Sequence, residues 1–176
     1  LFTEVPELIN RPFVQNFWLT IEKNILPNIK NCYTVNSEIA KIYSTKYNIP
    51  VKVIRNLAPK YHKKVHLEPF AEKIKGTKKM LILQGAGINV DRGAEEAVEA
   101  MQHLENCVLY IIGSGDVIGI LKNKIKTLNL EEKVFILSKM PYLELMKYTQ
   151  IADLGLSLDK NTNLNYEFSL PNKIFD

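Results

Sequence analysis

Residues 80–87 read Met-Leu-Ile-Leu-Gln-Gly-Ala-Gly, and residues 108–115 repeat the arrangement as Val-Leu-Tyr-Ile-Ile-Gly-Ser-Gly. In each, a short run rich in apolar residues is followed at once by two glycines separated by one residue. Apolar runs of this length, bounded by turn residues, are typical of buried strands. Glycine after such a strand allows a positive φ or a close approach of the backbone to a ligand, although tight turns without a ligand would also explain it. These two stretches therefore predict two buried strands and the junctions that follow them.

Working outward from these stretches, strands and helices alternate to the end of the chain. The predicted strands are 80–84, 108–112, 134–137 and 153–158, and the predicted helices are 91–103, 116–128 and 142–150. Such alternation implies parallel strands, right-handed crossovers and ligands at the carboxyl ends of the strands. The fold class expected from the sequence is α/β, a doubly wound parallel sheet.

The residues before Gly76 have a different character, because none of the eight glycines lies there. Pro12 to Leu26 places apolar residues at spacings of three and four, which predicts an amphipathic helix whose apolar face needs a partner. A short strand at 33–35, a helix from Ser37 as N-cap to Lys46, and a strand at 51–54 follow. With few elements, this part is interpreted as the tail of a preceding domain.

The net charge of +4 is concentrated in one stretch. Lys60 to Lys79 contains seven lysines against Glu68 and Glu72, so the remainder of the chain is slightly acidic. We interpret this stretch as a solvated basic linker. The alternative is a surface that binds a membrane or an anionic acceptor. The predicted domains are 1–59, the linker 60–79, and 80–176.

Composition narrows the class of protein further. Apolar residues make up 46% and charged residues 24% of the chain, as in soluble globular proteins, and the sequence lacks a run that could span a membrane. Cys32 and Cys107 are expected to be buried thiols in a reducing cytoplasm. The chain begins at Leu1 and stops within a helix start at Asp176, so we expect it to be a piece of a longer protein.

Two common nucleotide-binding motifs are absent. A third glycine is missing after Gly85-Ala86-Gly87, where Val90 stands, and after Gly113-Ser114-Gly115, where Ile118 stands. This disfavours a dinucleotide fingerprint, and no phosphate loop ending in Gly-Lys-Ser or Gly-Lys-Thr is present. The chain is therefore not expected to be a dehydrogenase or an NTPase.

The last six residues, Pro171-Asn172-Lys173-Ile174-Phe175-Asp176, predict the start of a helix. Lys173 and Asp176 are three residues apart, which places both side chains on one face of that helix. The lysine could meet a phosphate at the helix N-terminus while the acid accepts hydrogen bonds from sugar hydroxyls. The pair suits a sugar-nucleotide, although an exposed ion pair at a helix start is the alternative.

Taken in order, these segments resemble the retaining GT-B glycosyltransferases of the large group 1 family, of the bacterial polysaccharide and glycolipid assembly type. The resemblance implies the C-terminal, Rossmann-like donor-binding domain, truncated at its C-terminus, preceded by the helical end of the N-terminal acceptor domain. The segments that carry it are Asn31–Glu38, Val53–Asn56, Leu83–Gly85, Asp91–Gly93, Ile111–Gly115, Val134–Leu137, Tyr148 with Ala152-Asp153, and Pro171–Asp176.

The resemblance also assigns roles to individual residues. Arg92 and Lys173 are the expected catalytic residues, because the family neutralises the leaving diphosphate with basic side chains. Asp176 stands where a second acid binds the ribose, Phe168 replaces the first acid, and Glu167 is its neighbour. Gly87 stands where the family often has an arginine. The expected donor-binding residues are Gly85, Gly87, Gly113, Gly115, Glu167, Asn172 and Asp176.

The expected function is hexosyl transfer from a nucleotide-diphosphate sugar to a saccharide or lipid-linked acceptor, without a metal or other cofactor. The expected location is the cytoplasm, with possible peripheral contact at the inner face of the membrane, and no nucleic acid partner. The fragment alone is expected to be inactive, since catalysis needs the acceptor domain. Two alternatives stay open: a noncatalytic α/β module that binds a protein or anionic surface, and a sugar-nucleotide epimerase on the same scaffold.

Overall fold

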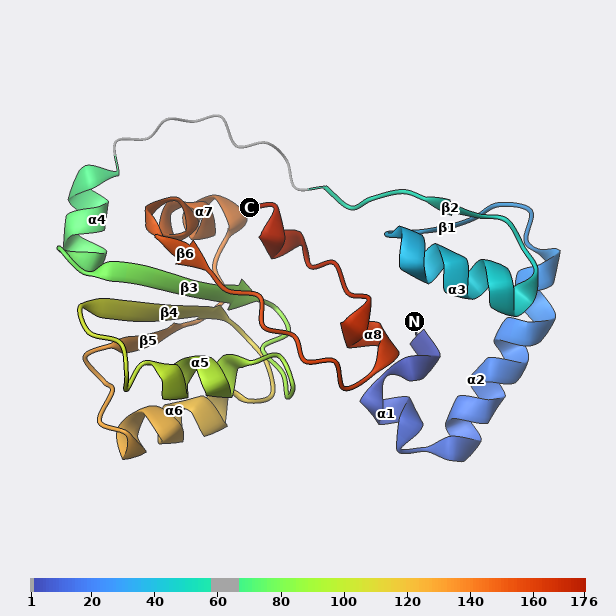
Figure 1. Cartoon of the computed structure of the whole chain (residues 1–176), viewed down its shortest axis with the longest axis horizontal. Coiled ribbons are helices and arrows are strands. Elements are labelled where there is room, and N and C mark those ends of the chain that lie inside the picture. The colour runs from blue at the N-terminus through green and yellow to red at the C-terminus, as the bar shows by residue number, and fades with distance from the viewer. Residues whose placement is uncertain (1, 58–66) are drawn as a thin grey trace. The chain divides into compact units, whose positions relative to one another are not determined.

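The computed structural model describes residues 2–57 and 67–176 and divides the chain into two compact units (Figure 1). Unit 1 comprises Leu1–Ala58 and Asn161–Asn172, and unit 2 comprises Pro59–Lys160 and Lys173–Asp176. Among the described residues, no helix is both long enough and apolar enough to cross a membrane.

Unit 2 is built on a parallel four-stranded sheet in the order β5-β4-β3-β6. The strands β3 and β4 pair from Lys79 opposite Cys107 to Gly85 opposite Gly113, so both glycine junctions leave the sheet at the same level. This sheet confirms the predicted α/β fold with a doubly wound parallel sheet. The strands are β3 (Lys79–Gly85), β4 (Cys107–Gly113), β5 (Val134–Leu137) and β6 (Leu154–Gly155), and the helices are α4 (Glu68–Lys75), α5 (Ala94–Ala100), α6 (Ile118–Thr127) and α7 (Tyr142–Ile151).

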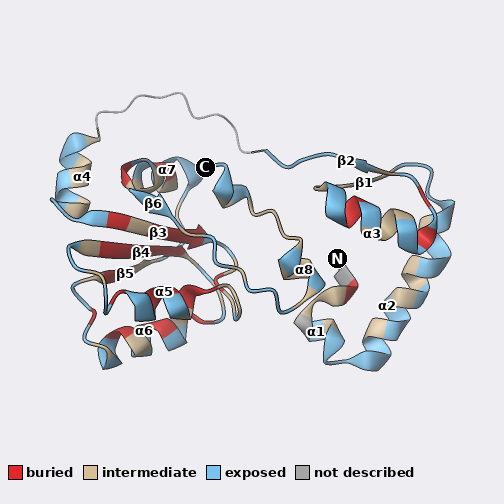
Figure 2. Ribbon diagram, in the orientation of Figure 1, coloured by how far each residue is buried: buried red, intermediate tan, exposed pale blue. Residues whose placement is uncertain are grey.

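Helices cover both faces of this sheet. Side chains alternate along each strand, so successive residues pack against helices on opposite faces. On β3, Leu83 belongs to a core cluster that includes residues of α5 and α6, whereas Ile82 belongs to a second cluster with residues of α4 and α7. Figure 2 shows the buried residues gathered along β3 and β4. The two central strands are buried on both faces, which explains their nearly continuous apolar sequence.

The structure corrects the predicted extent of the basic linker. Residues 60–66 lie outside the described part, but Glu68–Lys75 forms helix α4. Phe70 and Ile74 are four residues apart and pack with Ala71 against the core beside α7. Of the two lysines of α4, Lys73 is exposed, whereas Lys75 is half-buried and bonded to Asp153. The interpretation as a solvated connector was therefore wrong for Glu68–Lys75.

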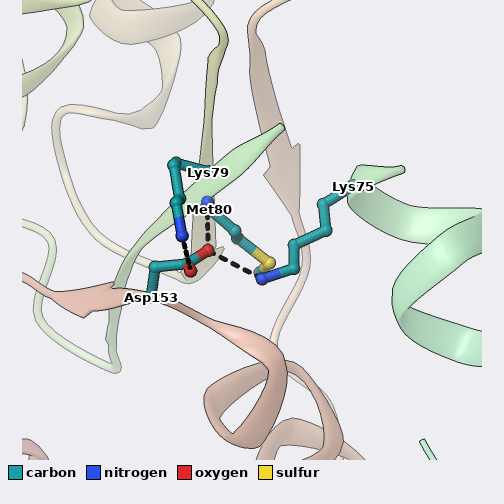
Figure 3. A network of polar contacts seen from close by, with 4 residues as sticks. All are labelled: Lys75, Lys79, Met80 and Asp153. Atoms are coloured by element: carbon teal, nitrogen blue, oxygen red, sulfur yellow. Dashed lines mark hydrogen bonds and ion pairs between the residues drawn. The ribbon is translucent and has the colours of Figure 1, made fainter. Parts of the chain in front are cut away.

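A carboxylate joins α4 to the start of the sheet (Figure 3). The Asp153 Oδ2 atom accepts hydrogen bonds from Lys75 Nζ at 2.7 Å and from the Met80 backbone N–H at 2.9 Å, while Oδ1 accepts one from Lys79 Nζ at 3.0 Å. The hydrogen bond from Lys75, followed by those from Met80 and Lys79, holds the pKa of Asp153 far below its usual range. Asp153 therefore fixes α4 against β3.

Helix α5 and strand β6 are shorter than the sequence predicts. Helix α5 begins at Ala94 rather than Asp91, because Asp91 and Gly93 both have left-handed backbone, with φ of 65° and 74°. Strand β6 covers only Leu154–Gly155 of the predicted 153–158. The Leu156 N–H still donates to the Ile82 carbonyl of β3 at 2.8 Å, and the chain beyond it forms the loop that contains Asp159.

Unit 1 contains a parallel pair of strands and several helices. Helix α3 begins under the Asn36 side chain, whose Oδ1 accepts a hydrogen bond from Ile39 N–H at 2.9 Å, so Asn36 rather than Ser37 is the N-cap. Helix α2 has no buried residue, and Phe13 is 93% exposed. The elements are η1 (Phe2–Glu4), α1 (Pro6–Ile9), α2 (Pro12–Ile25), η2 (Leu26–Asn28), β1 (Cys32–Thr34), α3 (Ser37–Tyr47), β2 (Val51–Val53) and α8 (Leu164–Glu167).

The segment Asn161–Asn172 returns to unit 1, so the unit boundary differs from the predicted range 80–176. The Asn36 Nδ2 group donates a hydrogen bond to the Phe168 carbonyl at 2.7 Å, which ties this segment beside the start of α3. The chain then re-enters unit 2 with the short 3-10 helix η3 (Asn172–Ile174) and ends at Asp176.

Candidate functional site

The two glycine junctions of unit 2 touch each other. A Cβ atom on Gly113 would lie 1.8 Å from the Gly85 carbonyl oxygen, and one on Gly115 would lie 2.1 Å from the Ile88 carbonyl oxygen. The Ser114 N–H donates to the Gly85 carbonyl at 3.3 Å, and the Ile88 N–H donates to the Ser114 carbonyl at 3.0 Å. The loops that follow β3 and β4 are thus held together by their backbones.

This contact explains why glycine is required at Gly113 and Gly115, since no side chain fits between the loops. Around Gly87 there is more room, because the nearest neighbour of a Cβ atom added there would be Asn89 Nδ2 at 4.0 Å. Gly85 takes a φ of 155°, which also favours glycine. That these four glycines line a donor site stays a prediction. The close contact between the two loops is by itself enough to explain glycine at Gly113 and Gly115.

Arg92 lies in the loop after β3 and bonds to Asp159 in the loop after β6. The Arg92 Nη1 atom is 3.2 Å from Asp159 Oδ2 and 3.3 Å from Oδ1, and the Asp159 side chain is only 8% exposed. The Lys160 N–H also donates to the Asp91 carbonyl at 2.8 Å. The strands β3 and β6 are neighbours, and the helices α5 and α7 cover opposite faces of the sheet. The carboxyl ends of β3 and β6 therefore form a topological switch point, the place where open α/β sheets bind ligands.

Lys173 is the second basic residue of this cluster. Burial lowers the pKa of the Lys173 ammonium group, the nearby Asp159 carboxylate raises it, and the Arg92 guanidinium lowers it. Two cations therefore share one partly enclosed region with a single carboxylate. A cation whose pKa is lowered by burial is stabilised by an added negative charge, so the cluster suits an anionic ligand.

Asp176 is held by two side chains of unit 2. Its Oδ2 atom accepts a hydrogen bond from Gln84 Nε2 at 3.1 Å, and its Oδ1 atom accepts one from the Tyr142 hydroxyl at 3.0 Å. The Gln84 Oε1 atom in turn accepts a hydrogen bond from the Thr149 hydroxyl at 2.7 Å. Burial, then the hydrogen bond and charge of Asp176, raises the pKa of the Tyr142 phenol.

The remaining predicted residues belong to the other unit. Glu167 is exposed at the end of α8, and Asn172 is exposed at the start of η3. Both are grouped with unit 1, whereas Arg92, Lys173 and Asp176 are in unit 2. The part of Glu167 and Asn172 in donor binding stays a prediction.

Sequence reasoning missed Asp159, Gln84 and Tyr142 as members of the cluster. Asp159 follows directly on the apolar run that was predicted as the last strand, and an acid at the carboxyl end of a strand is a usable signal. Gln84 is the polar residue that ends an apolar strand and is only 6% exposed, which is a second signal. No comparable pattern marks Tyr142. Within the described residues, no group of three His, Cys, Asp or Glu side chains is arranged to hold a metal ion.

Comparison with known proteins identifies one protein family. The sequence model of the family described as Glycosyl transferases group 1 matches residues 65–158, more than half of the chain. No curated protein matches the sequence significantly.

Several solved structures share the fold. A mutant of TarM from S. aureus, in complex with Fondaparinux, alpha-GlcNAc-glycerol and UDP, has a TM-score of 0.61 at 15% identity over 81% of this chain and 27% of TarM. HepE from Anabaena, in complex with UDP and glucose, has a TM-score of 0.64 at 13% identity over 79% of this chain and 41% of HepE. The sucrose-phosphate synthase of Thermosynechococcus elongatus has a TM-score of 0.60 at 17% identity over 80% and 37% of the two chains. The chain thus spans less than half of each of these proteins.

Proposed function

The chain belongs to the group 1 glycosyl transferases, and we propose that it carries the part of such an enzyme that binds the nucleotide-diphosphate sugar donor. The observation that carries this proposal is the cluster of Arg92, Lys173 and Asp159 at the carboxyl ends of β3 and β6. A site with two cations and one resident acid has a net positive charge in partly enclosed surroundings. Such a site attracts a diphosphate more strongly than an exposed pair of lysines would.

In this proposal, the basic residues act on the leaving group. As the bond between the sugar and the diphosphate breaks, negative charge grows on the departing phosphate oxygen. Arg92, whose guanidinium is already oriented by Asp159, donates hydrogen bonds to the phosphate oxygens, and Lys173 adds a second positive charge. Neutralisation by these side chains needs no metal ion. Asp176 accepts hydrogen bonds from the ribose hydroxyls of the same donor.

The acceptor side of the reaction is supplied elsewhere. Because the chain spans only 27–41% of the neighbouring structures, we propose that sugar transfer requires acceptor-domain residues outside it and that this chain alone only binds the donor. We further propose a retaining hexosyl transfer to a saccharide or lipid-linked acceptor in the cytoplasm, in polysaccharide or glycolipid assembly. The neighbours from S. aureus and Anabaena contain UDP, which makes UDP the first nucleotide to test.

A thermal-shift panel with UDP, GDP, ADP and CMP, each in EDTA, tests donor binding by the 176-residue chain. We expect at least one nucleoside diphosphate to raise the melting temperature, since a ligand that binds only the folded state stabilises it. CMP, which lacks the second phosphate, should give a much smaller shift. If none of the diphosphates stabilises the chain, a noncatalytic module becomes the better account.

The epimerase alternative is distinguished by its products. A protein that contains this chain and its acceptor domain would be incubated with UDP-glucose or UDP-N-acetylglucosamine, with and without a saccharide acceptor. A transferase releases UDP only as the acceptor is glycosylated. An epimerase would convert the sugar-nucleotide to its epimer without any acceptor, and chromatography of the products separates the two outcomes.

A further inference from the structure

We propose that Gln84, held in turn by Thr149, is a positioning residue that presents the Asp176 carboxylate to the ribose of the donor, together with Tyr142. The inference rests on the proposed function, and it adds three residues that act through Asp176. None of them was singled out by the sequence as part of the site.

The hydrogen-bond pattern fixes how the Gln84 amide is turned. A carboxylate only accepts hydrogen bonds, so the amide nitrogen must be the atom that lies 3.1 Å from Asp176 Oδ2. The amide oxygen then faces the Thr149 hydroxyl, which donates to it at 2.7 Å. The opposite orientation would set two acceptors against each other. The Asp176 carboxylate therefore sets the orientation of the Gln84 amide, and the Thr149 hydroxyl on α7, which also lies 3.2 Å from the Leu145 carbonyl oxygen, supports it with a hydrogen bond.

The two carboxylate oxygens are held separately. Gln84 occupies one position on Oδ2, and the Tyr142 hydroxyl occupies one position on Oδ1 at 3.0 Å. Each ionised oxygen can accept about two hydrogen bonds, so each keeps one position for a ligand. Two free acceptor positions on neighbouring oxygens match the two hydroxyls of a ribose cis-diol.

The contrast in exposure supports a positioning role. Asp176 is exposed, and an exposed aspartate without these contacts would rotate among several rotamers. Gln84 is 6% exposed at the end of β3, on the strand face that packs against α7. A buried amide therefore holds an exposed carboxylate in one rotamer. Ribose binding then does not have to immobilise the Asp176 side chain, which would otherwise weaken the binding.

The test compares UDP with 2′-deoxy-UDP by calorimetric titration of the 176-residue chain. Gln84→Leu removes both hydrogen bonds at nearly constant size. We expect wild type to prefer UDP, and Gln84→Leu to lose on the order of tenfold in affinity for UDP with little change for 2′-deoxy-UDP. A residue with only a structural role would lower both affinities alike. Equal losses, or unchanged discrimination in folded Gln84→Leu, would overturn the proposal.

Two further variants keep the test decisive if Gln84→Leu fails to fold. Thr149→Val removes the hydroxyl but keeps the shape, and it should lower the preference for UDP, whereas Thr149→Ser should retain it. Tyr142→Phe should lower the preference as well, since it frees Oδ1. If wild type binds neither nucleotide, the proposed function itself fails, and the positioning role fails with it. If wild type discriminates and Thr149→Val does so equally, only the positioning role is wrong.

Discussion

The Arg92 guanidinium and the Asp159 carboxylate meet at 3.2 Å, although 67 residues separate them in the sequence. They come from the loops after β3 and β6, which are neighbouring parallel strands. The buried carboxylate orients the guanidinium, and it also balances part of the positive charge that Arg92 and Lys173 bring together. A diphosphate would therefore meet a basic residue that is already held in place.

Arg92→Ala should lower the affinity for the nucleoside diphosphate by about 1.5 to 3 kcal/mol, roughly 10- to 150-fold, because a charge-assisted contact is lost. The measurement is a calorimetric titration at constant ionic strength. Arg11→Ala, at an exposed position of unit 1, is the matched control and should bind like wild type. Removing the guanidinium also leaves the Asp159 charge less well balanced, so Arg92→Ala/Asp159→Asn should recover stability without recovering affinity. An Arg92→Ala protein that is folded and binds normally would refute the assignment.

Lys173 gives the site an alkaline pH dependence. Burial lowers its pKa, so the ammonium group loses its proton below the pH at which an ordinary lysine does. Diphosphate affinity should therefore be full where Lys173 is charged and should fall as the pH rises through this lowered pKa. Lys173→Arg should retain affinity to higher pH, because arginine keeps its charge. Identical pH profiles for wild type and Lys173→Arg would show that Lys173 does not contact the ligand.

Alanine substitutions at Gly113 and Gly119 test the contact between the two loops, with Gly119 as the control position outside that contact. Gly113→Ala places a methyl group against the Gly85 carbonyl oxygen and should destabilise the fold by about 3 kcal/mol. No atom of the described residues lies within 4 Å of a Cβ on Gly119, which is in helix α6, so Gly119→Ala should be neutral or stabilise by up to about 1 kcal/mol. Urea unfolding of both variants measures the difference. Similar stabilities for the two would contradict the close approach of the loops.

The two lysines around Asp153 should contribute unequally to stability. Lys75 is 18% exposed and Lys79 is 70% exposed, so solvent screens the second ion pair far more. We expect Lys75→Met to cost about 1 to 2 kcal/mol and Lys79→Met at most about 0.5 kcal/mol in unfolding free energy. Equal costs in urea unfolding would show that α4 is not fixed through this contact.

Asp153→Asn should destabilise the fold in a pH-dependent way. The folded pKa of Asp153 is lowered, so its contribution is fully present above the ordinary aspartate pKa. That contribution is lost as the pH falls toward the lowered folded value. The difference in unfolding free energy between wild type and Asp153→Asn should therefore be largest at neutral pH and shrink under acid conditions. A difference that is constant with pH would indicate a steric effect.

The sheet of unit 2 was predictable because its strands are buried and end at glycines. Strand β5 has the predicted bounds 134–137, and β3 and β4 each extend only one residue beyond the prediction at either end. The start of α5 was less predictable, because the left-handed backbone at Asp91 and Gly93 delays it. Helix α4 was missed because the lysines before, within and after it obscured the spacing of Phe70 and Ile74.

The candidate site was predictable only in part. Arg92, Lys173 and Asp176 follow from their places in short motifs. Their partners Asp159, Gln84 and Tyr142 come from other strands and helices, and the sheet order decides which of these meet. A single sequence gives strand positions, but it does not give the pairing of β3 with β6 that joins Arg92 to Asp159.

Above all, we propose that unit 2 binds a nucleoside diphosphate through Arg92 and Lys173. Its most direct test is a calorimetric titration of UDP, or of whichever of GDP and ADP stabilises the chain, into wild type and Arg92→Ala/Lys173→Ala in the presence of EDTA. We expect saturable binding to wild type, with affinity reduced at least about 100-fold in the double variant while the protein remains folded. Equal affinities for both proteins, or no binding to folded wild type, would contradict it.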